Sequence, residues 1–171
     1  MTAPTLELDI DTAWPSSTDW EDLAARAAEA AGTVAPELAH EHLLVSIVMA
    51  DDEEVHALNK QWRAKDKPTN VLSFPMLSRE EVLAAAAQSG APGMLGDLIL
   101  AHGVCVREAA EKGIPVEDHA AHLIVHGLLH LAGYDHETSE ADATEMEALE
   151  TKALALMGLP NPYEAGPDAG H

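Results

Sequence analysis

Alternation and runs of apolar residues along the chain predict four β-strands. Residues 6–10 alternate apolar and polar side chains, which is the period of a half-buried strand. Residues 43–49 form a nearly continuous apolar run with several β-branched side chains, as is typical of a central strand. Two shorter strands are predicted at residues 70–74 and 97–101. We expect the four strands to form one sheet.

Between and after the strands, apolar residues recur at helical spacing. The first helix follows a capping-box pattern of Thr18 with Glu21, and Gly32 is its predicted end. Further helices are predicted at residues 51–62, 79–88, 104–112, 117–131 and 139–157. The combination predicts an α+β fold, in which one mixed sheet of about four strands packs with about five to six helices.

The chain of 171 residues shows no internal repeat and no linker that would divide it. We therefore expect one domain over residues 1–160, followed by a flexible Gly- and Pro-rich tail at residues 161–171. No apolar run approaches the ~18 residues of a membrane span, and the first residues do not resemble a signal peptide. These features favour a cytoplasmic protein without a membrane partner.

Charge narrows the range of functions. Nine Lys and Arg residues against 30 Asp and Glu residues give a net charge of −21. This balance argues against a sequence-independent binder of duplex nucleic acid and against docking on an anionic membrane. The single cysteine, Cys105, excludes a disulfide framework and a cysteine-based zinc site. We expect it to be a small buried residue on its helix.

Ten histidines are an unusual count for this length, and three of them form a metal-ligand pattern. His126 and His130 are four residues apart and share one face of their predicted helix. Gly133 permits the positive φ that ends a helix, which would bring His136 to the same point. Three imidazoles with one open position form the ligand set of a catalytic zinc. The spacing thus predicts one Zn²⁺ ion held by His126, His130 and His136.

Neighbouring positions refine this interpretation. His119 and His122 lie on the same helical stripe and are expected beside the ligands or at the rim of the site. The spacing also matches the zinc-peptidase motif H-E-x-x-H-x-x-G-x-x-H, but Gly127 stands where that motif has its general-base Glu. A peptidase is therefore disfavoured, whereas metal-assisted hydrolysis is not. The opposite face of the helix is expected to be core and comprises Ala120, Leu123, Ile124, Leu128 and Leu131.

Basic residues are concentrated in one window of the chain. Residues 60–79 hold five of the nine Lys and Arg residues, the last of them Arg79, and only Asp66 opposes them. Arg63 is the best candidate for contacting a phosphate, because a guanidinium offers forked donors. A local basic segment in an acidic protein suits single-stranded RNA better than bulk duplex. We predict that RNA is bound by Lys60, Arg63, Lys65 and Lys67.

These segments together resemble the YbeY family of bacterial endoribonucleases and ribosomal RNA maturation factors. The resemblance rests on residues 126–136 (HGLLHLAGYDH), 59–75 (NKQWRAKDKPTNVLSFP), 96–100 (GDLIL) and 145–150 (EMEALE), with Pro162 and Tyr163 closing the pattern. It implies zinc ligation by His126, His130 and His136, and an Arg63 that engages the RNA backbone beside the metal. It also implies an endoribonuclease specific for single strands. Such an enzyme would mature the 3′ end of 16S rRNA and serve ribosome quality control, with ribosomal particles as partners.

The reaction expected of these residues is attack of zinc-activated water on a phosphodiester, with Arg63 as the catalytic residue that neutralises charge on the phosphoryl oxygens. Attack by the 2′-hydroxyl of the RNA itself is an alternative. Two other functions stay open at this point. One is a metal-dependent hydrolase of another substrate, and the other is a ribosome assembly factor whose zinc is structural.

Overall fold

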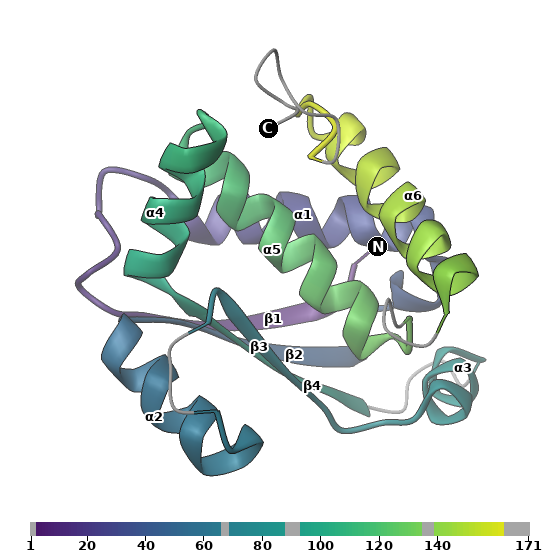
Figure 1. Ribbon diagram of the computed structural model, residues 1–171. Coiled ribbons are helices and arrows are strands. Elements are labelled where there is room, and N and C mark those ends of the chain that lie inside the picture. Colours follow the sequence, from purple (N-terminus) through teal and green to yellow (C-terminus); the bar gives the residue numbers. More distant parts are fainter. Residues whose placement is uncertain (1–2, 66–68, 88–92, 135–138, 163–171) are drawn as a thin grey trace.

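The computed structural model describes residues 3–65, 69–87, 93–134 and 139–162 of the chain. Its centre is one four-stranded sheet with the strand order β1-β2-β4-β3 (Figure 1). Strands β1, β2 and β4 are parallel, and β3 is antiparallel to β4. The predicted α+β class with one mixed sheet is thereby confirmed. The strands are β1 (Thr5–Ile10), β2 (Leu43–Ala50), β3 (Val71–Pro75) and β4 (Gly93–Ala101).

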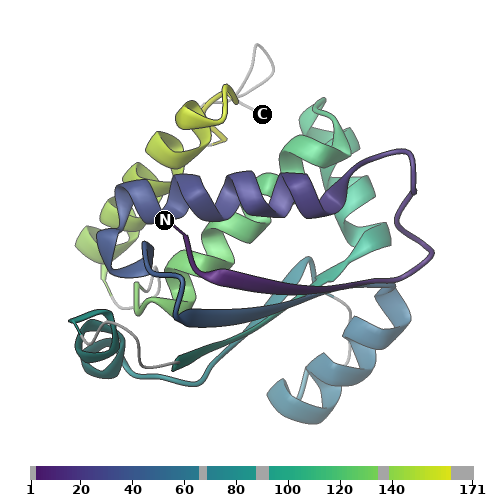
Figure 2. The same ribbon diagram turned by 180° about the vertical axis from the view of Figure 1, so that it is seen from behind.

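Helices cover both faces of the sheet. Figures 1 and 2 show α1, α4, α5 and α6 on one side and α2 on the other. Helix α5 contacts α1, α4 and α6 as well as strands β3 and β4, so it lies at the centre of the thicker layer. None of the helices in the described part of the chain is long and apolar enough to cross a membrane. The helices are α1 (Trp20–Val34), η1 (a 3-10 helix, Pro36–Leu38), α2 (Asp52–Arg63), α3 (Arg79–Ala87), α4 (His102–Lys112), α5 (Val116–Leu131) and α6 (Glu140–Leu156).

The first helix differs from the expected one at both ends. Its N-cap is Asp19, whose side chain accepts a hydrogen bond of 3.0 Å from the backbone N–H of Asp22. The predicted cap, Thr18, instead donates from Oγ1 to Glu117 at 2.7 Å. Gly32 does not end the helix, because it lies on the buried side of α1 and packing there outweighs its low helix propensity. Strand β4 is also longer than expected, since residues 93 and 94 pair with β2.

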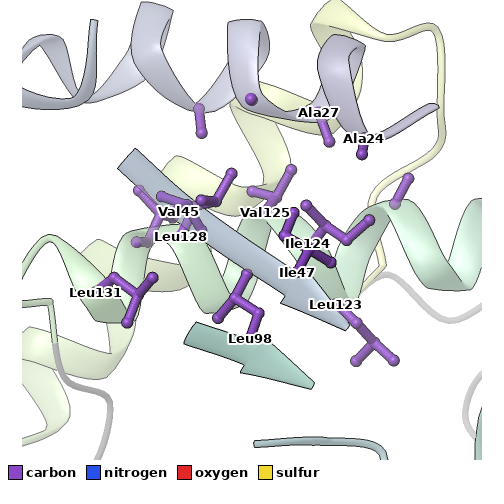
Figure 3. Close-up of a cluster of buried hydrophobic side chains, with 14 of the residues drawn as sticks. Ala24, Ala27, Val45, Ile47, Leu98, Leu123, Ile124, Val125, Leu128 and Leu131 are labelled. Atoms are coloured by element: carbon purple, nitrogen blue, oxygen red, sulfur yellow. The ribbon is translucent and has the colours of Figure 1, made fainter. Parts of the chain in front are cut away.

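The hydrophobic core has two parts, one on each face of the sheet. The larger part lies between the sheet and helices α1, α5 and α6, and alternate residues of β2 enter it. Figure 3 shows Val45, Ile47 and Leu98 of the sheet facing Ile124 and Leu128 of α5. The smaller part packs α2 against the other face and contains Ala50, Val55, Leu72, Ile99 and Ala101.

The core face of α5 is the one expected from the sequence. Its five predicted core residues are all buried: Ala120, Leu123, Ile124, Leu128 and Leu131. Burial of these side chains fixes the rotation of α5 about its axis, because each buried Leu or Ile contributes about 1.5–3 kcal/mol. The remaining faces of the helix, which carry the histidines, are therefore held in a defined orientation.

Candidate functional site

His126 is oriented by a buried carboxylate from another helix. Its Nδ1 atom lies 2.9 Å from Oε2 of Glu150 on α6. The other oxygen of Glu150 lies 2.7 Å from Nε2 of His122, and Glu150 is only 1% exposed. Because a carboxylate accepts, the hydrogen of His126 is on Nδ1 and the lone pair is on Nε2. This is the tautomer that ligates a metal through Nε2.

His130 is held in the same manner from the sheet. Its Nδ1 atom lies 3.0 Å from the hydroxyl Oγ of Ser73 in β3. The protein therefore contacts both histidines through Nδ1, which places Nε2 at the opposite edge of each ring. His126 and His130 are one helical turn apart on α5, so the two rings share a face of the helix.

The residues on this face fit a divalent transition metal. Imidazole nitrogens are good ligands for zinc, and a carboxylate on the second ring nitrogen, as Glu150 provides for His126, is a usual support of a metal-binding histidine. The third predicted ligand, His136, lies outside the described residues. Within the described residues, no group of three or more His, Cys, Asp and Glu side chains is arranged to hold a metal. The three-histidine set stays a prediction.

The turn that follows α5 has the backbone expected of Gly133. Its φ is +106°, and the chain folds back there, with the N–H of Tyr134 bonded to the carbonyl of Leu129 at 3.1 Å. A Cβ at Gly133 would lie 2.6 Å from Cδ and 2.8 Å from Cβ of Arg79, so the close approach also requires glycine. The turn therefore redirects the chain directly before the segment that contains His136.

A polar cluster fixes this turn. Arg79 donates to Glu37 and to the carbonyl of Ala132, and the hydroxyl of Tyr134 donates to Glu37 at 2.7 Å. Burial alone would raise the pKa of Glu37, but hydrogen bonds from its own backbone, Tyr134 and Arg79 outweigh burial and lower that pKa. Burial and the bond to Glu37 raise the pKa of Tyr134 to about 12. Arg79 thus serves the turn, although it belongs to the basic window of the sequence.

The close packing of α5 on β4 accounts for glycine at position 127. It faces Leu98 of β4, and a Cβ at this position would lie 2.6 Å from the Leu98 Cδ2 atom. A glutamate here would be forced into the sheet. The missing peptidase base therefore reflects the close contact between α5 and β4.

Arg63 is the last residue of α2, the helix that lies on the other side of the sheet from α5 (Figure 1). Its Nη2 atom donates to the backbone carbonyl of Ser73 at 2.6 Å, and its guanidinium stacks 5.4 Å from the centre of the Phe74 ring. Ser73 therefore connects Arg63 with His130. Lys60 and Lys65 are exposed nearby in the chain, whereas Lys67 lies outside the described residues.

His119 and His122 were expected beside the metal ligands or at the rim of the site, and the structure places them in two different polar clusters. Both are buried, at 2% and 8% exposure. His122 shares Glu150 with His126, whereas His119 contacts Oε1 of Glu108 through Nε2 at 2.8 Å. Burial lowers the pKa of His119 and outweighs the opposing effect of Glu108. His119 therefore belongs to a separate polar cluster.

Glu150 was missed as a site residue by sequence reasoning, although a signal for it exists. It occupies the buried stripe of α6 together with Met146, Ala153 and Leu154. A carboxylate on an apolar stripe must have a buried partner. Glu108 and Ser73 carry no such signal, because both lie at positions where polar residues are ordinary.

The structure thus combines an α+β fold with a helix that carries two histidines held through Nδ1, and an exposed arginine reaches the same edge strand. The sequence model of the family described as Endoribonuclease YbeY matches residues 10–158. A relative from Novosphingobium aromaticivorans, named Endoribonuclease YbeY, is 78% identical over 163 residues, covering 95% of this chain and 98% of its own. The chain belongs to the YbeY endoribonuclease family.

Further similarities agree with this assignment. A protein of the same name from Erythrobacter litoralis is 56% identical over 158 residues, which are 92% of this chain and 96% of that protein. The solution structure of TM1509 from Thermotoga maritima superposes with a TM-score of 0.59 at 25% identity, covering 89% of this chain and 88% of its own. The similarity thus extends over most of the sequence and the fold.

Proposed function

We propose that this chain is a metal-dependent endoribonuclease that cuts single-stranded RNA, with one zinc ion held by His126, His130 and His136. The observation that carries the proposal is the contact of the protein with Nδ1 of both His126 and His130. That arrangement places Nε2 of each ring at the edge opposite its Nδ1 contact, and the carboxylate of Glu150 puts the lone pair of His126 on Nε2. Membership of the YbeY family supplies the substrate class.

The chain contributes positioning and charge to the reaction. Zinc, when bound, supplies a Lewis acid for the phosphodiester and for the attacking oxygen. Glu150 and Ser73 hold the two imidazoles in the ligating orientation. Arg63, anchored on the carbonyl of Ser73, offers further N–H donors to the phosphoryl oxygens as their charge grows. The exposed Lys60 and Lys65 attract the RNA backbone, while the acidic remainder repels non-specific nucleic acid.

Metal content and cleavage test the proposal together. We expect purified protein to retain about one zinc per chain, and His126→Ala and His130→Ala to lose both zinc and cleavage of single-stranded rRNA. Arg63→Ala should keep zinc but lose about 10²- to 10³-fold in cleavage rate. His40→Ala and Arg26→Ala, which change the same residue types elsewhere, should behave like wild type. Equal zinc content in wild type and His126→Ala would refute the ligand assignment.

The biological substrate we propose is the 3′ end of the 16S rRNA precursor, in cytoplasmic ribosomal particles. Depletion of the protein should then lead to accumulation of 16S rRNA with unprocessed 3′ ends, and Arg63→Ala should not restore processing. Product analysis decides the attacking group. A 2′,3′-cyclic phosphate indicates attack by the 2′-hydroxyl, whereas a 5′-phosphate indicates attack by water.

A further inference from the structure

A cavity of about 520 Å³ opens beside His126 on the side facing the start of α5. It lies between residues 69–71 at the start of β3, the second half of α4 and the part of α5 from His119 to His126. Its volume is within the range of about 300–1,000 Å³ that is usual for small-molecule sites. The lining residues are Thr69, Asn70, Val71, Glu108, Glu111, Lys112, His119, His122, Leu123 and His126.

One carboxylate in this cavity is fixed by two neighbours. Oε1 of Glu108 accepts a hydrogen bond of 3.0 Å from Nδ2 of Asn70 and contacts Nε2 of His119 at 2.8 Å. His119 is 2% exposed, so it holds Glu108 from the protein interior. The Glu108 side chain remains 33% exposed. Its second oxygen, Oε2, makes no hydrogen bond to any of the described residues and can accept one from a ligand.

The charge of the lining selects the kind of ligand. Glu108 and Glu111 are opposed by Lys112 alone among the Lys and Arg residues of the cavity wall. A phosphate would be repelled by this surface, whereas hydroxyl and amino groups would donate to its carboxylates. The apolar side chains of Val71 and Leu123 add a surface against which a flat ring can pack.

The position of the cavity connects it with the reaction. His126 is at once a lining residue of the cavity and a predicted metal ligand. A strand of RNA whose phosphate lies at the metal must place the next nucleoside within a few ångströms of it. Asn70, which holds Glu108, is also the residue that directly precedes the β3 strand carrying Ser73.

We propose that this cavity is a nucleoside subsite, which takes the ribose and base adjoining the scissile phosphate, with Glu108 Oε2 accepting a hydrogen bond from that nucleoside. The inference rests on the proposed nuclease function, because the phosphate at the metal is what brings a nucleoside to the cavity. Glu108 is then a specificity-determining residue, and Asn70 and His119 are positioning residues that act through it.

Substrate modification combined with Glu108→Gln tests the subsite. The glutamine side chain keeps an oxygen for Asn70 and His119 but presents an amide N–H₂ where the second carboxylate oxygen was. Single-stranded RNAs are prepared with one abasic nucleotide on either side of the cut, or with one 2′-deoxy nucleotide on the 3′ side only, because the 2′-hydroxyl on the 5′ side is the alternative nucleophile. Wild type should cleave the intact RNA about 10- to 100-fold faster than one of these modified RNAs. Glu108→Gln should lose most of this preference, and Glu147→Gln, which removes the same charge from α6, should keep it.

A second variant and a binding measurement complete the test. Thr69→Trp adds a large side chain to the lining of the cavity and should abolish the same preference without altering Glu108. In a chelator, where no cleavage occurs, uncharged ribonucleosides should shift the NMR signals of residues around Asn70 in wild type and not in Thr69→Trp. An unchanged preference in Glu108→Gln, or identical NMR spectra with and without ribonucleoside, would refute the subsite. If wild type cleaves no RNA, the proposed function fails, while the NMR comparison still decides whether the cavity binds nucleosides.

Discussion

Nδ1 of His126 lies 2.9 Å from Oε2 of Glu150, and this contact joins helix α5 to helix α6 at the candidate metal site. The two residues are 24 positions apart in the sequence. Glu150 also contacts His122, so a single buried carboxylate determines the orientation of two imidazoles. The relation makes the metal affinity of the site depend on a residue that is not itself a ligand.

Replacement of Glu150 should therefore weaken metal binding. An amide at this position cannot accept from both imidazoles through two oxygens, so Glu150→Gln should bind zinc about 10- to 100-fold more weakly. Competition with a chromophoric chelator measures this affinity. Glu147→Gln on the exposed side of the same helix is the control. If Glu150→Gln binds zinc as wild type does while its thermal unfolding is unchanged, the positioning role is wrong.

Introducing the peptidase glutamate at position 127 should lower the free energy of unfolding and should not create peptidase activity. Gly127→Glu places atoms where Leu98 lies, and overpacking of this kind costs about 1–3 kcal/mol of the free energy of unfolding. Urea denaturation measures the loss, and no cleavage of a generic peptide should appear. The smaller substitution Gly127→Ala should be partly relieved by Leu98→Ala in the same chain. Strict additivity of these two changes would contradict the proposed clash.

The cluster around Glu37 should make stability depend on acid pH. The pKa of Glu37 is lowered on folding from its ordinary value of 4.5, so the folded state binds fewer protons there than the unfolded state. The stabilisation is therefore present above pH 4.5 and is lost as the pH falls through the lower pKa of the folded protein. Glu37→Gln should be less stable than wild type at neutral pH, and the difference should shrink in acid.

Unfolding by urea at a series of pH values measures this dependence. Glu29→Gln, an exposed acid on α1, is the matched control and should show no such trend. A difference between wild type and Glu37→Gln that stays constant from neutral pH down to about pH 3 would refute the assignment of the effect to Glu37.

Cys105 should be inert toward thiol reagents in the folded protein. Its side chain is fully buried, and burial together with the charge of Glu108 raises its pKa to about 12, so almost no thiolate forms near neutral pH. Reaction with Ellman's reagent should follow the rate of unfolding, and one thiol per chain should react in denaturant. Rapid reaction of the native protein would show that the α4 side of the core opens on its own.

Local patterns predicted the fold well because most elements carry their own signal. The apolar run of β2 and the periodic apolar residues of α5 predict both the element and its buried face. The ends of α1 were wrong because Thr18 and Gly32 respond to tertiary contacts, with Glu117 and with the packed side of the helix. The sequence around α1 offers more than one capping residue and more than one possible end, and only the contacts with neighbouring elements decide between them.

The candidate site was predictable only in part. The four-residue spacing of His126 and His130 predicts a shared helix face, since the helix itself brings them together. The residues that orient them come from elsewhere: Glu150 from α6 and Ser73 from β3, 57 positions away from His130. The nucleoside cavity likewise depends on the approach of α4 to α5, which no spacing in the sequence encodes.

The contacts of Ser73 require that β3 and β4 pair in the correct register. It is paired with Leu98 in the ladder between β3 and β4, and it holds His130 through its hydroxyl and Arg63 through its carbonyl. A slip of one residue in this pairing would turn the side chain to the opposite face and exchange it for Leu72 or Phe74. The same error would separate the histidine from the arginine. Correct alignment of one short edge strand is thus a condition for assembling both halves of the proposed catalytic site at once.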